Sequence, residues 1–238
     1  ILPNMPSVII PNAIDESKFQ QKHLTVEERQ KFRTKYGIAE DDVLFLFIGR
    51  IGEEKRVLEL LGICKRIVSK NEHCKVMFVG NGPAYSEMTE LSEKEIYEGK
   101  IIFTGFVEWA MVHNFYESAD IFITASLSEM HSMTVLEAEL SSLPLIVRQD
   151  ESYLDSIVNG ENGYTCATDE EMEKRALELA SDKEKRKAFG KKSFEISNQF
   201  SIENHIKRTL FVYNEVIKAY PKKINDEDVM KRMAEYLA

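Results

Sequence analysis

Short apolar runs alternate with longer amphipathic stretches through the middle of the sequence. The apolar runs are rich in β-branched and aromatic residues and lack polar alternation, as strands covered on both faces do. They predict six strands, at residues 43–49, 75–80, 100–105, 120–126, 144–147 and 163–166. Helical patterns lie between them, near residues 56–69, 83–98, 108–118, 133–142 and 150–159. This alternation predicts an α/β fold, a Rossmann-like parallel sheet sandwiched by helices.

Beyond Thr168 the pattern becomes helical, which predicts a helical C-terminal extension. Proline lacks the amide hydrogen that a helix interior needs, so Pro221 should separate the last two helices. We divide the chain into a Rossmann-like domain over residues 1–200 and C-terminal helices over residues 201–238. The helices of this part are predicted at 169–180, 182–198, 201–220 and 226–237.

Charge and composition exclude several classes of protein. The net charge is −9, whereas nucleic-acid-binding proteins usually carry a basic surplus, so we expect no nucleic-acid partner. The densest basic run, at residues 183–192, fits a contact with anionic lipid or, more commonly, the solvated face of a surface helix. The three cysteines and five histidines lack the spacings of a disulfide framework or a zinc site. We therefore expect a reducing compartment and no protein-bound metal.

Two segments follow predicted strands at the edge where a parallel sheet binds ligands. In the first, Gly49 ends a strand, Arg50 follows it, and Lys55 precedes a helix. Glycine permits close approach of the backbone to a ligand, and the two cations offer hydrogen-bond donors to a phosphate. Cations are also common at strand ends that bind no ligand. This segment alone therefore supports a phosphate site and an ordinary strand end equally.

The second segment places Glu129 in a loop and Glu137 inside the following helix. Other glutamate pairs share this spacing, but only this pair straddles a loop-to-helix junction after a buried strand. The amides of His131, Ser132 and Met133 would lie near the helix start, where unpaired N–H groups bind anions. Glu137 could then accept the hydroxyls of a ribose and Glu129 those of a sugar. The alternative is a helix N-terminus that carries favourable acidic residues.

Together the two segments resemble family 4 of the retaining glycosyltransferases. The likeness lies in GR followed by K five residues later, then S-x2-E-x7-EA, then LP and a strand. Further matches keep the family's order. VIIPNAID resembles P-N-G-[IV]-D, VGNGP resembles G-x-G-P, and VNGENGY resembles G-x-N-G. A stretch ending in YESADIFITAS resembles Y-x-x-A-D-x-[FV]-x-x-[AP]-S, so the resemblance spans roughly residues 8–166.

The family has a GT-B fold, in which two Rossmann-like domains face each other across a cleft. The resemblance implies that Arg50 and Lys55 bind the donor diphosphate and that Glu129, the third residue of the catalytic set, binds the donor sugar. The family's N-terminal domain, which holds the acceptor, has no room before Ile1. We therefore expect the C-terminal domain alone, inactive by itself, with its last helices crossing toward that absent domain. Among the donor-binding residues, Phe106 and Val107 would contact the nucleotide base and Glu137 the ribose. The full donor-binding set comprises Gly49, Asn81, Gly82, Phe106, Val107, His131, Ser132, Met133, Thr134 and Glu137.

The chain departs from the family pattern at several glycines. The usual E-G-F-G becomes Glu129-Met130-His131-Ser132, so Met130 and Ser132 place side chains at two glycine positions. Ser132 is still small, whereas Met130 could crowd the donor. The usual A-x-G-x-P is here Ser141–Pro144 without glycine, and Ala13 replaces the glycine of N-G-I-D. E-x-H-S-M followed by VRQD is similar to bacterial diacylglycerol glucosyltransferases and related envelope enzymes.

The resemblance implies a retaining hexosyltransferase that takes glucose from UDP-glucose to an envelope acceptor such as diacylglycerol or a glycan. It implies a nucleotide-sugar substrate, no cofactor and no metal. It also implies a cytoplasmic location, with peripheral membrane association of the full-length enzyme. Two alternatives stay open, a sugar-nucleotide epimerase of the same architecture and a non-catalytic nucleotide-binding module.

Overall fold

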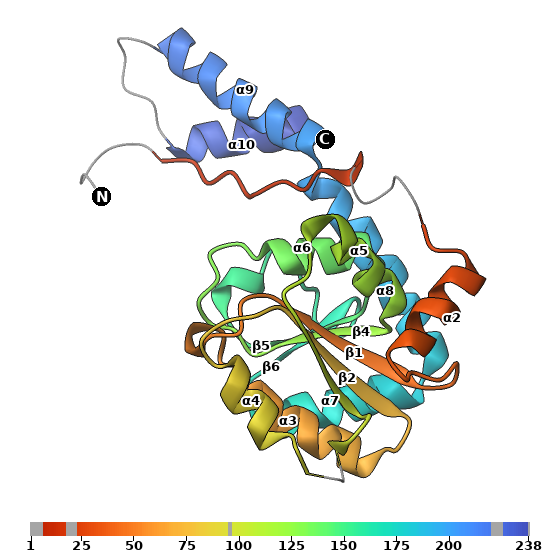
Figure 1. Cartoon of the computed structure of the whole chain (residues 1–238). Helices are drawn as coiled ribbons and strands as arrows, with labels where there is room; N and C mark the ends of the chain where they lie inside the picture. The colour runs from red at the N-terminus through yellow and green to blue at the C-terminus, as the bar shows by residue number, and fades with distance from the viewer. Residues whose placement is uncertain (1–6, 18–22, 95–96, 220–225, 238) are drawn as a thin grey trace. The chain divides into compact units, whose positions relative to one another are not determined.

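The computed structural model describes residues 7–17, 23–94, 97–219 and 226–237 (Figure 1). The chain divides into two compact units. The larger covers Ser17–Ser197, and the smaller joins Ile1–Glu16 to Asn198–Ala238. Residues 7–16 thus group with the C-terminal helices, whereas they were predicted to belong to the Rossmann-like domain.

The larger unit is built on a six-stranded sheet in which every neighbouring pair is parallel. All six predicted strands are confirmed, and their order is β3-β2-β1-β4-β5-β6. The order reverses beside β1, where β2 lies on one side and β4 on the other. The strands are β1 (Val43–Ile48), β2 (Cys74–Val79), β3 (Ile101–Gly105), β4 (Ile121–Thr124), β5 (Leu145–Arg148) and β6 (Gly163–Cys166).

Helices cover both faces of the sheet, which confirms the predicted sandwich (Figure 1). Side chains of a strand alternate between faces, so Phe45 and Phe47 of β1 join one core cluster and Leu44 and Leu46 join the other. Both clusters exclude water, which explains the unbroken apolar run. One face is covered by α3 (Val57–Lys70), α4 (Tyr85–Leu91) and α7 (Asp169–Ser181), and the other by α2 (Val26–Lys35), α5 (Trp109–Ser118) and α6 (Met133–Leu140), while α8 (Lys183–Ser197) packs against α6 and α7.

The prediction of a helix over residues 150–159 is wrong. Only a 3-10 turn, η3 (Glu151–Tyr153), forms there. Asp150 caps the start of this turn by accepting from the amide of Ser152. Further along, Asn162 accepts from the amide of Val158, a group that would bond within the helix predicted over these residues. Polar side chains of this kind compete with helical hydrogen bonds and favour turns.

Two other helices differ from expectation. The helix predicted over residues 83–98 is confirmed only as α4, and residues 95–96 lie outside the described part of the chain. The helix α2 was not predicted from the sequence, although Thr25 and Glu28 form a capping box at its start. This S/T-x-x-E signal marks a helix N-terminus and could have revealed it.

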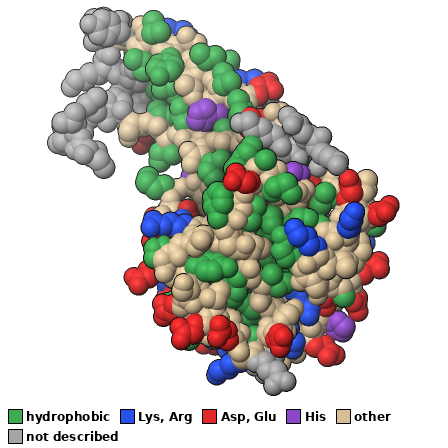
Figure 2. Space-filling view, in the orientation of Figure 1, with side chains coloured by type: hydrophobic (Ala, Val, Ile, Leu, Met, Phe, Trp, Pro, Cys, Tyr) green, Lys and Arg blue, Asp and Glu red, His purple; other side chains and the backbone are tan. Residues whose placement is uncertain are grey.

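The smaller unit contains α9 (Ile202–Ala219) and α10 (Asp226–Leu237), as predicted; Pro221 lies outside the described residues. The buried Glu215 of α9 forms ion pairs with Lys218 and with Arg232 of α10. Figure 2 shows apolar side chains exposed along α9. Within the described residues, no helix has the length and apolar character needed to cross a bilayer. The crossing of these helices to another domain stays a prediction.

Candidate functional site

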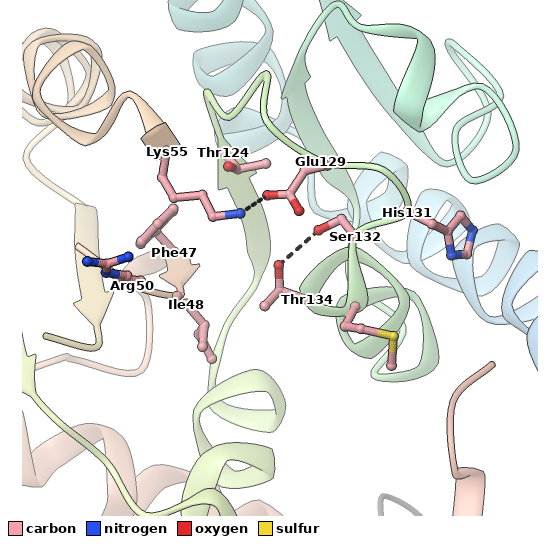
Figure 3. A pocket seen from close by; sticks show the side chains of 11 residues that line it. Phe47, Ile48, Arg50, Lys55, Thr124, Glu129, His131, Ser132 and Thr134 are labelled. Carbon is pink, nitrogen blue, oxygen red and sulfur yellow. Dashed lines mark hydrogen bonds and ion pairs between the residues drawn. The ribbon is translucent and has the colours of Figure 1, made fainter. Parts of the chain in front are cut away.

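A cavity of about 310 Å³ opens at the carboxyl ends of β1 and β4. This is the point where the strand order reverses, and ligands bind at such points in open parallel sheets. The loops after β1 and β4 diverge there because their chains continue to opposite sides of the sheet. The lining residues are Phe47, Ile48, Gly49, Arg50, Lys55, Thr124, Glu129, His131, Ser132, Met133 and Thr134 (Figure 3).

The centre of the cavity holds an ion pair between two predicted catalytic residues. Lys55 comes from the short 3-10 helix η1 (Glu53–Lys55), and Glu129 comes from the loop after β4. Lys55 Nζ lies 2.5 Å from Glu129 Oε1 (Figure 3). Ser126 Oγ donates to the same carboxylate oxygen at 2.9 Å. Both charged side chains are mostly buried, so their attraction is only partly screened by water. Lys55 Nζ has further donors and Glu129 has a second oxygen, so a ligand can bind beside this pair or by opening it.

Arg50 lies at the rim of the cavity and is less constrained. Its side chain is 65% exposed, and its nearest acid is Glu54, at 3.6 Å from Nη1. An exposed i,i+4 ion pair of this kind is worth little, so the guanidinium is available to a ligand.

The loop that follows Arg50 packs closely against a glycine. A Cβ at Gly82 would lie 2.3 Å from the carbonyl oxygen of Ile51, so only glycine permits this contact.

The N-terminus of α6 forms the opposite wall. Ser132 is the N-cap residue, yet its hydroxyl pairs with Thr134 Oγ1 at 3.2 Å and makes no capping hydrogen bond. The first turn contains no acidic residue. The alternative of a helix start with acidic residues therefore fails for α6. Unsatisfied amides and the positive end of the helix dipole make this wall attractive to anions.

Glu137 lies one turn inside α6 and is outside the lining of the cavity. Its Oε2 accepts a hydrogen bond from the hydroxyl of Tyr116 at 2.7 Å. Burial raises the pKa of the Glu137 carboxyl, and the hydrogen bond from Tyr116 acts in the opposite direction.

Two side chains of the E-x-H-S segment point away from the centre. Met130 is 94% exposed and does not line the cavity, and its effect on the donor stays a prediction. The imidazole of His131 is directed away from the Lys55–Glu129 pair (Figure 3). Burial lowers the pKa of His131, while the charge of Asp155 raises it.

The remaining predicted donor-binding residues lie on other loops and do not line the cavity. Asn81 and Gly82 follow β2, and Phe106 and Val107 follow β3. Phe106 is 72% exposed, whereas Val107 packs against a core cluster. The roles of these four residues in donor binding stay predictions.

The structure adds Phe47, Ile48 and Thr124 to the site. These residues were predicted to lie in strands, and their second role was not predicted. They are the last residues of β1 and β4, and only the order of the strands reveals that these two ends face one cavity.

A possible cation-binding group lies elsewhere. Among the described residues, Asp41, Asp42 and His73 bring ligand atoms within 4.8 Å of one another. They directly precede β1 and β2, at the opposite edge of the sheet from the cavity. Lys75 Nζ lies 3.9 Å from Asp42 and already supplies positive charge. The absence of a metal from the reaction stays a prediction.

The comparisons with known proteins agree with this fold. The family described as "Glycosyl transferases group 1" matches residues 28–196. The alpha-monoglucosyldiacylglycerol synthase of Acholeplasma laidlawii is 27% identical over 217 residues, which cover 91% of this chain and 54% of that protein. This chain therefore spans about half the length of that relative.

Two solved structures share the fold. Anabaena Alr3699/HepE in complex with UDP superposes with a TM-score of 0.73 at 16% identity, covering 87% of this chain and 57% of that one. The C-terminal domain of the Francisella tularensis group 1 protein LpcC has a TM-score of 0.68 at 21% identity, covering 79% of this chain and 99% of that one. Since the family match covers more than half of its residues, this chain belongs to the group 1 glycosyl transferases.

Proposed function

We propose that this chain is the donor-binding half of a retaining glycosyltransferase. In this proposal it binds UDP-glucose, and the complete enzyme transfers glucose to an envelope acceptor such as diacylglycerol or a glycan. The observation that carries the proposal is the meeting of Lys55, Glu129 and the N-terminus of α6 in one cavity at the strand-order reversal.

The chemistry of the cavity fits departure of a nucleoside diphosphate. Negative charge grows on the leaving group as the bond to the anomeric carbon breaks, and fixed positive groups stabilise that charge. Lys55, Arg50 and the α6 amides are such groups. Glu129 would exchange Lys55 for hydroxyls of the sugar, and Glu137 would accept the hydroxyls of the ribose. The cavity lies at the small end of the range for ligand sites, roughly 300–1,000 Å³, which suits a diphosphate and one sugar ring.

The names of similar proteins support the choice of substrates. The Acholeplasma laidlawii relative is a monoglucosyldiacylglycerol synthase, and the HepE structure contains UDP. We take from them glucose, the uracil base and a lipid acceptor. We also propose that the complete enzyme acts at the cytoplasmic face of a membrane, where it would meet a lipid acceptor.

A thermal-shift measurement with UDP-, GDP- and ADP-sugars tests donor binding on this chain itself. The LpcC domain was solved as a separate C-terminal domain, which supports measurement on the chain alone. A ligand that binds only the folded state stabilises it by about 2.7 kcal/mol at one hundred times its dissociation constant. We expect UDP-glucose to raise the Tm most. A larger shift with a GDP- or ADP-sugar would refute the base, and no shift with any of them at millimolar concentration would refute the proposal.

Replacement of Glu129 by glutamine should separate sugar transfer from nucleotide binding. The change removes charge-assisted hydrogen bonds to the sugar, and loss of one such bond costs about 1.5–3 kcal/mol, or roughly 10- to 150-fold. We expect transfer by the complete enzyme to fall by that factor. The affinity for UDP should stay level or rise, because in the variant the charge of Lys55 is no longer paired with the carboxylate of residue 129.

The matched control is Glu178→Gln, which breaks an ion pair with Lys185 away from the cavity. It should leave both transfer and UDP affinity near those of the wild type. Equal losses of transfer and of UDP affinity in Glu129→Gln would contradict the role of Glu129 at the sugar.

A further inference from the structure

A buried tyrosine supports the glutamate that the proposed function places at the ribose. Tyr116 of α5 has no exposed surface, and its hydroxyl lies 2.7 Å from Glu137 Oε2 and 3.3 Å from the carbonyl oxygen of Thr134. A tyrosine hydroxyl donates one proton, and an O–H···O bond is usually 2.5–3.0 Å long. The carboxylate is therefore the main acceptor, and the carbonyl contact is a long, secondary one.

The ring and the hydroxyl of Tyr116 have separate roles. The ring belongs to a core cluster and stacks on Phe122, with 6.2 Å between ring centroids. Phenylalanine would fill the same space. A hydroxyl adds nothing to apolar packing and is costly to bury unless it is hydrogen-bonded. Here its bond goes to Glu137, so the hydroxyl serves that carboxylate rather than the core.

We propose that Tyr116 is the positioning residue for Glu137, holding Oε2 so that the other carboxylate oxygen is presented to the ribose hydroxyls. This inference rests on the proposed function, in which Glu137 binds the ribose. Tyr116 itself touches no ligand. Its place in the interior of α5 explains why the spacing of the glutamates alone does not reveal it.

The same bond keeps Glu137 in the form that accepts hydroxyl protons. Burial raises the pKa of Glu137, and donation from Tyr116 lowers it. The pKa of Tyr116 is itself raised well above its ordinary value, chiefly by burial and then by the charge of Glu137, so the hydroxyl keeps its proton at neutral pH. Without that hydroxyl, the pKa of Glu137 should rise further, and the carboxylate should become protonated at a higher pH.

The test uses Tyr116→Phe with UDP-glucose as the probe, because its diphosphate stays fully ionised at the pH values concerned. We expect the affinity for UDP-glucose to fall about tenfold at neutral pH, as loss of a hydrogen bond to a charged group does. Wild-type affinity should decline as the pH falls through the pKa of Glu137. In Tyr116→Phe the decline should begin at a higher pH, a shift that a purely structural role would not produce.

A substrate analogue provides a second measurement. UDP-glucose lacking both ribose hydroxyls should bind the wild type more weakly than UDP-glucose does. In Tyr116→Phe the two ligands should bind more nearly alike, because their difference depends on the carboxylate that Tyr116 holds. An unchanged ratio between the two affinities would refute the inference.

The matched control is Tyr164→Phe, since the hydroxyl of Tyr164 donates to Glu178 at 2.8 Å away from the cavity. It should leave the affinity and its pH dependence unchanged. Loss of affinity in Glu137→Gln together with a wild-type pH profile in Tyr116→Phe would overturn the positioning role and leave the proposed function intact. Failure of the wild type to bind UDP-glucose would overturn the proposed function, and this inference with it.

Discussion

Replacement of Lys55 by alanine should lower the turnover of the complete enzyme by about two to three orders of magnitude, as loss of one charge-stabilising donor does. Lys55 lies in the interior of the cavity, where its charge acts in a medium less polar than water. The change also leaves the Glu129 carboxylate without its cation, so the charges of Arg50 and Glu129 cancel and the lining of the cavity offers a diphosphate no net positive charge from side chains. Both effects raise the barrier for departure of the nucleoside diphosphate.

The measurement is steady-state sugar transfer by the complete enzyme, with kcat and KM determined separately. Lys185→Ala is a suitable control, because Lys185 also pairs with a glutamate, Glu178, but lies away from the cavity. Arg50→Ala should show a loss of the same order, because its exposed guanidinium can turn to the diphosphate once a donor binds. Turnover of Lys55→Ala within a few-fold of the wild type would refute the assignment of the cavity as the donor site.

The sheet could be predicted from the sequence because its strands are covered on both faces. In β1 all six residues are buried, and such a run leaves an apolar signal that no surface element imitates. The residues of the site were harder to predict. Lys55 and Glu129 are each unremarkable in a chain rich in charge, and they become a site only because β1 and β4 are neighbours. Sequence order does not fix strand order, so only the family resemblance linked the two residues before the structure did.

Other parts of the site depend on contacts that no pattern along the chain encodes. The sequence pattern indicates only that Tyr116 is a core residue of an amphipathic helix. Its hydrogen bond to Glu137 follows from the packing of α5 beside α6. Glu139 is an extreme case. It is fully buried without a hydrogen-bond partner among the described residues, and burial raises its pKa well above the ordinary range. A glutamate usually lies on the solvated face of a helix, and α6 packs against α8, so the burial of Glu139 follows from packing rather than from its residue type.

Replacement of Arg33 by methionine should lower the free energy of unfolding by about 3–5 kcal/mol, as removal of one partner from a buried ion pair does. Arg33 of α2 has no exposed surface. Its guanidinium donates to Asp120 Oδ2 at 3.0 Å and to the carbonyl oxygens of Ser118, Ala39 and Asp42 at 2.9, 3.0 and 2.6 Å. Methionine fills much of the volume but removes the donor to the carbonyl oxygens of Ala39 and Asp42, and each unpaired group adds to the cost. Ser118 and Asp120 keep a hydrogen bond from Arg29.

Chemical denaturation should show this effect as a lower midpoint concentration of denaturant. The slope of the free energy of unfolding against denaturant concentration should stay unchanged. Arg29→Met is the matched control, since Arg29 pairs with the other oxygen of Asp120 at 3.0 Å but is one-third exposed. Arg29 also donates to three backbone carbonyl oxygens, but because water reaches its side chain, its loss should cost less than that of Arg33. A smaller loss in Arg33→Met than in Arg29→Met would contradict the account. The ion pair of Arg33 with Asp120 matters for the site as well as for stability. Asp120 also accepts from the amide of Leu44 at 2.8 Å and so connects β1 to β4. The opposite ends of these two strands form the cavity.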